Sequence, residues 1–308
     1  MTDILITGGR GFIGTNLTKE LRSRGHEVWT SDILQGEDPQ HLRADVSSFQ
    51  QMDAIFRERS FDYVYHLAAE YGRWNGEDHY ANLWRTNVTG TKHMLRLQEQ
   101  HGYKMIFFSS AEVYGDYEGL MTEDVMETVP IKQMNDYAIS KWAGELQCLN
   151  HAEMFGGQTV RVRPVGCYGP FEYYSRYRGV IPIFVYHALM GLPFTVYRGH
   201  QRIFDYVQDT CRTFANIVDS FIPEEVYNVG GREEWVISIE ELADIVLCAT
   251  GADPSLVAYK DEEAFTTRVK IVDFSKARRD LGHDPQVDIH EGIRRYVAWA
   301  RRIYGIKI

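Results

Sequence analysis

Short apolar runs rich in β-branched residues alternate, through the first half of the chain, with longer segments of helical period. This alternation is typical of a parallel sheet covered by helices on both faces, because each return to a parallel strand needs a crossover. We predict strands at 4–7, 28–31, 63–67, 105–109 and 160–163, and helices near 12–24, 50–58, 83–100 and 137–155. The sequence therefore predicts a doubly wound α/β domain.

The pattern changes after Pro170 to irregular chain rich in Tyr, Pro, Gly and Arg, with short helices near 210–221, 239–249 and 289–303. We interpret residues 166–308 as mainly a smaller α/β domain and residues 1–165 as the doubly wound domain. A chain of 308 residues is long enough to hold both. Residues 226–229 are predicted to form a strand that rejoins the main sheet, so the chain crosses between the two domains more than once.

A glycine-rich turn follows the first predicted strand. Gly8, Gly11 and Gly14 lie between this strand and an amphipathic helix, where they allow a pyrophosphate to approach backbone N–H groups at the helix start. The next strand ends at Asp32, whose carboxylate accepts hydrogen bonds from a ribose diol and repels a 2′-phosphate. This order predicts a Rossmann-type domain that binds NAD, although Arg10 is able to neutralise a phosphate. A structural turn with a chance acid is the alternative.

Tyr137 and Lys141 lie four residues apart, on one face of a predicted helix. A neighbouring ammonium and a nicotinium charge both stabilise a phenolate, so Tyr137 is suited to take a hydroxyl proton while hydride leaves the same carbon. The strand at 105–109 leads into Ser110 and Glu112, at the sheet edge where open α/β sheets bind ligands. A surface pair is the alternative for a Tyr and a Lys at this spacing alone.

Several further motifs occur in the same order along the chain. They are TGGRGFIG at 7–14, Asp32, Asp45-Val46, HLAA at 66–69, NVTGT at 87–91, SSAEVYG at 109–115, YAISK at 137–141, RPVGCYGP at 163–170, RIFDYVQD at 202–209, Arg268 ahead of Asp273, and LGHDP at 281–285. In these motifs nearly the whole chain resembles the extended short-chain dehydrogenase/reductases, specifically the NAD-dependent nucleotide-sugar epimerase/dehydratase family.

The resemblance implies a role for each matching residue. Ser110 binds the sugar hydroxyl that is oxidised, Tyr137 is the base, and Lys141 holds the nicotinamide ribose and lowers the pKa of the tyrosine. The implied contacts of the cofactor are Gly8, Gly11, Phe12, Ile13 and Gly14 in the turn, Asp32, Asp45 and Val46 at the adenosine, and Leu67, Ala68 and Ala69 along its side. Arg202 and Arg268 match positions that contact the nucleotide diphosphate, for which a planar guanidinium is suited; a surface salt bridge is the alternative.

Two departures from the family pattern bear on the reaction. Gly166 stands where many relatives carry an Asn that touches the diphosphate, and Ala111 stands where 4,6-dehydratases carry an Asp that protonates the leaving hydroxyl. Alanine donates no proton, which disfavours simple 4,6-dehydration. Glu112 is interpreted either as a second acid/base, at C3 or C5, or as a solvated residue or ribose contact.

We therefore predict a nucleotide-sugar 4-epimerase that works through a transient 4-keto intermediate. The alternatives are a dehydratase, a decarboxylase, a multi-carbon epimerase or a C4 dehydrogenase of the same family, and, more distantly, a non-catalytic NAD-binding protein. The resemblance also implies a homodimer in which the helices near 83–100 and 137–155 form a four-helix bundle.

Two loops are candidates for contacts with the substrate. Residues 70–80 carry Arg73, Trp74 and Asn75, which suit a sugar-specificity element, with Arg73 able to contact an acidic sugar. A plain surface loop is the alternative. Residues 171–178, with three tyrosines and two arginines, are interpreted either as a lid over the nucleotide or as a packed domain interface.

Composition excludes several other functions. A net charge of −10, from 33 Lys and Arg against 43 Asp and Glu, repels phosphate backbones, so we expect no nucleic-acid partner. The eleven His and four scattered Cys show no metal-ligand spacing, and we expect no metal. The most apolar stretch, 180–194, is too short to cross a bilayer. With no signal-peptide pattern at the N-terminus, we expect no membrane association and a cytoplasmic location.

Overall fold

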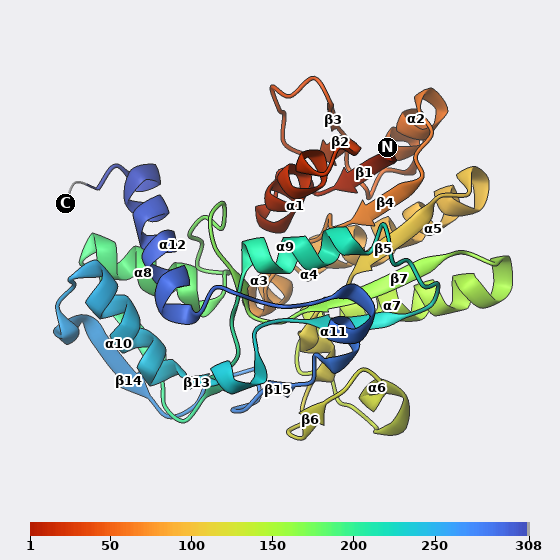
Figure 1. Ribbon diagram of the computed structural model, residues 1–308. Coiled ribbons are helices and arrows are strands. Elements are labelled where there is room, and N and C mark those ends of the chain that lie inside the picture. The colour runs from red at the N-terminus through yellow and green to blue at the C-terminus, as the bar shows by residue number, and fades with distance from the viewer. Residues whose placement is uncertain (307–308) are drawn as a thin grey trace.

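A seven-stranded sheet forms the centre of the computed structural model, which describes residues 1–306. Every neighbouring pair of its strands is parallel, in the order β12-β7-β5-β4-β1-β2-β3 (Figure 1). The strands are β1 (Asp3–Thr7), β2 (Glu27–Asp32), β3 (His41–Arg43), β4 (Tyr63–His66), β5 (Lys104–Phe108), β7 (Thr159–Pro164) and β12 (Val226–Val229). The predicted doubly wound sheet is confirmed, and β12 pairs with β7 within it.

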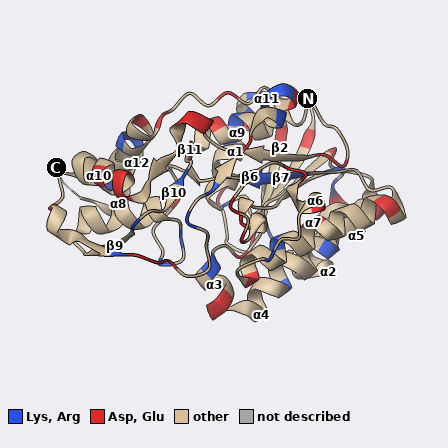
Figure 2. Ribbon diagram, turned by 90° about the horizontal axis from the view of Figure 1, so that it is seen from below, with Lys and Arg blue, Asp and Glu red and all other residues tan. Residues whose placement is uncertain are grey.

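Helices cover both faces of this sheet, because successive side chains of each strand point to opposite sides. Ile4 and Ile6 pack in one layer of the core, whereas Leu5 packs in the other. The first layer contains α1 (Phe12–Ser23), α9 (Val207–Asn216) and α11 (Ser275–Leu281), and the second contains α2 (Phe49–Glu58), α5 (Gly90–His101) and α7 (Asp136–Phe155). Figure 2 shows these two layers on opposite sides of the strands.

A second core lies in the other half of the chain, where apolar residues of three helices and one strand pack together. These elements are α8 (Val180–Met190), α10 (Ile239–Thr250), α12 (Ile289–Tyr304) and β9 (Phe194–Tyr197). The strand β9 pairs in parallel with β14 (Val257–Lys260). Helix α10 begins with a reciprocal capping box between Ser238 and Glu241, which satisfies two backbone N–H groups at its start.

Short elements connect the two cores. They are α3 (Arg73–Asp78), α4 (Tyr80–Leu83), the π-helical turn η1 (Trp84–Thr89), the 3-10 turns η2 (Ala111–Tyr114), η3 (Glu233–Trp235) and η4 (Pro254–Leu256), α6 (Val125–Thr128), and the strands β6 (Leu120–Met121), β8 (Cys167–Tyr168), β10 (Gln201–Arg202), β11 (Asp205–Tyr206), β13 (Ile237–Ser238) and β15 (Ile271–Val272). The helix predicted at 83–100 is thus divided into η1 and α5. In η1 the side chain of Asn87 bonds both the backbone N–H and the carbonyl of Glu70, which ties this turn to the chain after β4.

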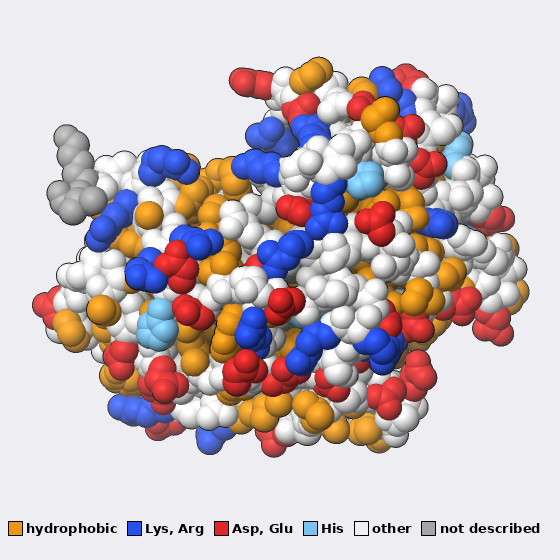
Figure 3. Space-filling view, in the orientation of Figure 1, with side chains coloured by type: hydrophobic (Ala, Val, Ile, Leu, Met, Phe, Trp, Pro, Cys, Tyr) orange, Lys and Arg blue, Asp and Glu red, His pale blue; other side chains and the backbone are white. Residues whose placement is uncertain are grey.

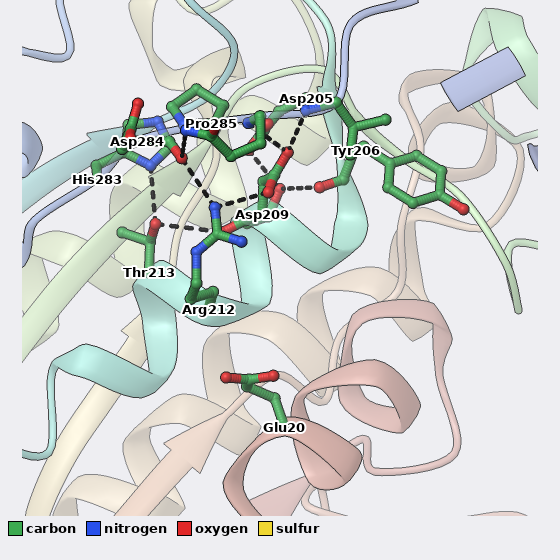
Figure 4. A network of polar contacts seen from close by, with 12 residues as sticks. Glu20, Asp205, Tyr206, Asp209, Arg212, Thr213, His283, Asp284 and Pro285 are labelled. Carbon is green, nitrogen blue, oxygen red and sulfur yellow. Dashed lines mark hydrogen bonds and ion pairs between the residues drawn. The ribbon is translucent and has the colours of Figure 1, made fainter. Parts of the chain in front are cut away.

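The start of α9 fastens the segment before α12 to the main sheet (Figure 4). One carboxylate oxygen of Asp209 accepts the backbone N–H groups of Gln286 and Val287, each at 2.8 Å. Its other oxygen accepts Arg212 Nη2 at 2.7 Å, and Thr213 Oγ1 lies 2.8 Å from Nδ1 of His283. A single buried aspartate therefore holds together two parts of the chain that are almost eighty residues apart.

Candidate active site

A cavity of about 1410 Å³ lies at the carboxyl edge of the main sheet, between the two cores. The structure brings almost all of the predicted site residues to its wall. They are Gly8, Gly11, Phe12, Ile13, Gly14, Asp32, Asp45, Val46, Leu67, Ala68, Ala69, Arg73, Ser110, Glu112, Tyr137, Lys141 and Arg202. Arg268 does not line the cavity; its side chain is 57% exposed and lies 3.8 Å from Glu262.

The glycine turn forms a cradle with no room for side chains. Gly8 has a φ of +69°, and a Cβ placed there would lie 2.8 Å from the backbone nitrogen of Ala68. A Cβ on Gly14 would lie 2.3 Å from the carbonyl oxygen of Gly8. Gly11 caps the start of α1, where backbone N–H groups without intrahelical partners face the cavity. This cradle fits the pyrophosphate of a dinucleotide.

The carboxylate at the end of β2 is fixed beside this cradle. Asp32 accepts the backbone N–H groups of Arg10 and Leu34, each at 3.1 Å. Along the neighbouring strand, Thr7 Oγ1 accepts the backbone N–H of Ala68 and bonds the ring of His66. Burial, with the charge of Lys141, lowers the pKa of His66 to about 3, so this imidazole is a neutral packing group.

Ser110, Tyr137 and Lys141 meet where β5 ends and α7 begins. Ser110 caps η2, and its Oγ accepts the backbone N–H of Glu112 at 3.2 Å. Asn135 caps α7 by accepting the N–H of Ala138, so Tyr137 and Lys141 lie in the first two turns of that helix. Lys141 Nζ donates to the carbonyl oxygen of Phe108 at 2.8 Å. The cap and this bond fix the ammonium and the phenol at the sheet edge.

Burial sets the protonation of this group. Tyr137 and Lys141 are each 5% exposed. Desolvation lowers the pKa of Lys141 to about 7, because the charged form loses its hydration. Desolvation also raises the pKa of Tyr137, although a hydrogen bond with Ser110 opposes the rise. The phenol by itself is therefore protonated at neutral pH, because burial raises its pKa.

An ion pair that was not predicted lies in the same cavity. Lys270 Nζ donates to Glu112 Oε1 at 2.5 Å, and the side chains are 8% and 26% exposed. Burial favours the neutral form of Glu112, but the charges of Lys270 and Arg73 outweigh it and lower the pKa of the carboxyl. Lys270 directly precedes β15. In the sequence, its position two residues after Arg268 is the one feature that could have pointed to this site.

The two predicted arginines on the cavity wall are bonded to the protein itself. Arg73, at the start of α3, pairs with Glu263 at 2.7 Å and donates to the carbonyl oxygen of Ala264. Arg202 donates to the carbonyl oxygens of Gln201, Thr267 and Arg268 and to the hydroxyl of Thr266. Both side chains thereby hold residues 263–268 against the cavity.

Gly166 stands at a position where an asparagine does not fit. Its φ is +58°, and a Cβ placed there would lie 2.0 Å from the carbonyl oxygen of Ile203. The backbone between β7 and β8 therefore packs directly against the chain after Arg202. A residue with a Cβ would be strained at this φ and would clash with the carbonyl of Ile203, so glycine suits the position.

All but one of residues 171–178 line the cavity, and two of them contact the end of α3. Arg176 Nη2 and the Tyr177 hydroxyl both donate to Asp78 Oδ2 at 2.9 Å. Glu172 is buried, and desolvation raises its pKa to about 8, so its side chain is largely uncharged at neutral pH.

A buried polar network begins at Ser109, the neighbour of Ser110 in the chain. Ser109 Oγ donates to Glu145 on α7, and Arg163 of β7 donates to both oxygens of that carboxylate at 2.9 and 2.7 Å. Arg163 also donates to the Tyr114 hydroxyl, which in turn donates to Asn228 Oδ1. The network joins β5, β7, β12 and α7 behind Ser110. No sequence signal pointed to it, since its members are spread over more than a hundred residues.

The sheet, the glycine cradle and the Ser110–Tyr137–Lys141 group define a dinucleotide-dependent enzyme of the short-chain dehydrogenase/reductase class. The chain belongs to the NAD dependent epimerase/dehydratase family, whose sequence profile matches residues 4–230. The predicted family is thus confirmed.

The relatives of the chain catalyse several reactions. The chain is 30% identical to the UDP-N-acetyl-alpha-D-glucosaminuronate decarboxylase of Bacillus cytotoxicus, over 97% of this chain and 98% of that protein. It is 27% identical to the dTDP-glucose 4,6-dehydratase of Neisseria meningitidis serogroup B, over 97% of this chain and 93% of that protein.

Solved structures show the same range. The UDP-glucose 4-epimerase of Thermotoga maritima with UDP-glucose superposes with a TM-score of 0.88 at 27% identity, covering 98% of this chain and 99% of that one. A double mutant of DesIV of Streptomyces venezuelae, a dTDP-glucose 4,6-dehydratase with NAD bound, superposes with a TM-score of 0.87 at 27% identity, covering 98% of both. The predicted cofactor, NAD, is confirmed.

No helix among residues 1–306 has both the length and the apolar content that crossing a bilayer needs. No group of three or more His, Cys, Asp or Glu side chains in the same range is arranged to hold a metal ion. Acidic and basic side chains are interspersed on the face seen in Figure 3.

Proposed function

We propose that the protein is an NAD-dependent nucleotide-sugar 4-epimerase, which oxidises a hexose transiently at C4. The observation that carries this proposal is the meeting of Ser110, Tyr137 and Lys141 with the glycine cradle in one cavity. An oxidation at a secondary carbon needs a base for the hydroxyl proton and a hydride acceptor beside the same carbon. Residues 1–165, whose sheet is rejoined by β12, would bind NAD, and residues 166–308 would mainly bind the nucleotide sugar.

In this proposal Tyr137 removes the proton of the C4 hydroxyl, while Ser110 Oγ hydrogen-bonds the same oxygen. Lys141, which is fixed to the Phe108 carbonyl, supplies positive charge near the phenolate oxygen, and its lowered pKa makes it a ready proton donor. The cradle and Asp32 would hold NAD, which when bound would supply a hydride acceptor beside C4. The 4-keto sugar turns within the cavity before it is reduced on its other face, and Tyr137 gives the proton back.

The diphosphate of the substrate is proposed to lie along the wall formed by Arg202 and residues 263–268. Arg202 shapes this wall through its bonds to backbone carbonyls, and the exposed Arg268 is free to swing toward a phosphate. The UDP-glucose 4-epimerase and dTDP-glucose 4,6-dehydratase among the similar structures support a nucleoside diphosphate sugar as the substrate class. Arg73 is proposed to contact the sugar.

A second candidate is an enzyme that changes the 4-keto sugar further, by dehydration, decarboxylation, epimerisation at another carbon or net oxidation. The Glu112–Lys270 pair favours it, because a simple 4-epimerase needs only the Ser–Tyr–Lys group and NAD. The decarboxylase and dehydratase among the relatives support it as well.

Mass spectrometry with chromatographic separation tests the two candidates. Purified protein is incubated with a panel of UDP-, GDP-, CDP- and dTDP-sugars and no added cofactor. A new isomer of unchanged mass supports the 4-epimerase, whereas loss of water, carbon dioxide or two hydrogens supports the second candidate. Tyr137→Phe should lower turnover about 100-fold or more with the fold retained, and full turnover by this variant would remove Tyr137 from the mechanism.

The expected homodimer stays a proposal, and exposed apolar side chains on the two helical segments support it. They are Trp84 in the first segment and Ile139, Leu146 and Met154 in the second. A monomeric mass by light scattering at micromolar concentration would contradict it. The cytoplasmic location also stays a prediction.

A further inference from the structure

Arg178 is a cation on the cavity wall that has no anionic partner among residues 1–306. It lies two residues before the start of α8, and its half-buried side chain lines the cavity. Within the described part of the chain, its guanidinium forms no ion pair with a carboxylate and donates no hydrogen bond. A guanidinium that loses water without gaining an acceptor is costly. Its donors are therefore available to a ligand.

Four other cations on the cavity wall already have acceptors within the protein. They are Arg73 with Glu263, Arg176 with Asp78, Lys270 with Glu112, and Arg202 with the backbone carbonyls of residues 201, 267 and 268. These contacts match most of the positive charge of that wall before any substrate arrives. Arg178 differs from them because its charge is left for the substrate to match.

The guanidinium of Arg178 lies close to the residues that would react. Its central carbon is 5.2 Å from the ring centroid of Tyr71, and that centroid is 5.5 Å from the ring centroid of Tyr137. Burial raises the pKa of Tyr137, and the charge of Arg178 is among the influences that oppose this rise. These short distances place Arg178 within reach of a hexose whose C4 hydroxyl meets Tyr137.

Glu172 belongs to the same segment as Arg178 but does not neutralise it. The side chain of Glu172 is 3% exposed, and its Oε2 has no hydrogen-bond partner among residues 1–306. Burial raises the pKa of Glu172 to about 8, and the charge of Arg178 opposes this rise without overcoming it. At neutral pH the positive charge of Arg178 is therefore uncompensated on this side of the cavity.

We propose that Arg178 binds a carboxylate on the hexose, and that the substrate is therefore a nucleotide-linked uronic acid. A planar guanidinium matches a carboxylate through two parallel hydrogen bonds. A neutral hexose would displace water from the guanidinium and offer only hydroxyl groups in return. This inference rests on the proposed function, because it names the sugar class of that nucleotide-sugar substrate.

The diphosphate of the substrate is the competing anion, and a comparison of sugars separates the two. Isothermal titration of the NAD-loaded enzyme first ranks free UDP, GDP, CDP and dTDP. The glucose and glucuronate forms of the tightest-binding nucleotide are then compared, by titration for affinity and by mass spectrometry for turnover. We expect the glucuronate form to bind at least about 10-fold more tightly than the glucose form, the value of a hydrogen bond between charged groups.

Variants assign this preference to one side chain. Arg178→Met should lower the affinity for the glucuronate form about 10- to 100-fold, and it should leave the affinities for the glucose form and for the free nucleotide at their wild-type values. Arg178→Gln, which is polar but uncharged, gives the same comparison if the methionine variant does not fold. Arg198→Met is the matched control. It removes a 57% exposed arginine that pairs with Asp261, and it should behave as wild type in every titration.

Two results would overturn the inference. Equal affinity of the wild-type enzyme for the two sugar forms is one. A loss of affinity for the free nucleotide in Arg178→Met and Arg178→Gln is the other, because it would place Arg178 at the diphosphate. Failure of the proposed function looks different: neither sugar form is oxidised or epimerised, yet the glucuronate form still binds more tightly through Arg178. If both forms react equally well and bind equally, the proposed function stands and this inference alone fails.

Discussion

Replacing Gly14 by alanine tests the cradle on which cofactor binding depends. The new Cβ would lie 2.3 Å from the carbonyl oxygen of Gly8 and 2.9 Å from Cα of Gly9. Both neighbours are backbone atoms, so no side chain is able to swing away. To reach ordinary contact the oxygen and the Cβ must separate by roughly 1 Å, which displaces the start of α1 from the turn and costs about 1–3 kcal/mol.

This displacement falls on the surface that would receive the pyrophosphate. If most of the cost of this displacement weakens the binding of NAD, the affinity for NAD falls about 10- to 100-fold. Isothermal titration of cofactor-free protein with NAD measures the change, and thermal unfolding without NAD measures any loss of stability. We expect weaker NAD binding together with a folded protein.

Gly251→Ala is the matched control. Gly251 ends α10 with a φ of +70°, and among residues 1–306 a Cβ placed there would meet no atom within 4 Å beyond its own chain neighbours. This substitution should cost about 1 kcal/mol of stability through backbone strain and leave NAD affinity unchanged. Wild-type affinity in Gly14→Ala, or equal losses in both variants, would refute the reasoning.

Two further predictions concern stability. Arg163→Met should lower the free energy of unfolding by about 3–5 kcal/mol, because it leaves the Glu145 carboxylate buried without its main partner. Chemical denaturation measures this loss. A much smaller loss in Arg163→Met than in the Glu145→Ala variant would contradict the prediction. Lys141→Met should abolish turnover yet raise the melting temperature, more at pH 7 than at pH 10. Burial lowers the pKa of Lys141 from its usual 10.5 to about 7, so the unfolded chain binds this proton more readily than the folded protein does. The cost to folding of burying the charged lysine is therefore full below about pH 7, and it decreases as the pH rises toward 10.5. Equal shifts at both pH values in calorimetry would count against it.

Local sequence accounts for the elements whose signals are contained in a few neighbouring residues. The strand, glycine turn and helix from Asp3 to Ser23 follow from a run of apolar residues and from glycines where no side chain fits. Tyr137 and Lys141 follow from helical spacing. Two local features were not predicted. The strand β3 spans three residues, which is too few to show a period of two. The π-helical turn η1 continues directly from α4 into α5 and differs from them in its hydrogen-bond pattern, which the periodicity of the sequence does not show.

The doubly wound sheet, the cradle for NAD and the Ser–Tyr–Lys group are predictable from local sequence, because each depends on spacing along one strand, turn or helix. The surroundings of that group are visible only once the chain is folded. Lys270 reaches Glu112 across 158 residues, and Arg163 reaches Glu145 from a different element. Such contacts depend on how separate segments pack, and the protonation of Glu112 and Lys141 depends on the burial and charge that packing creates.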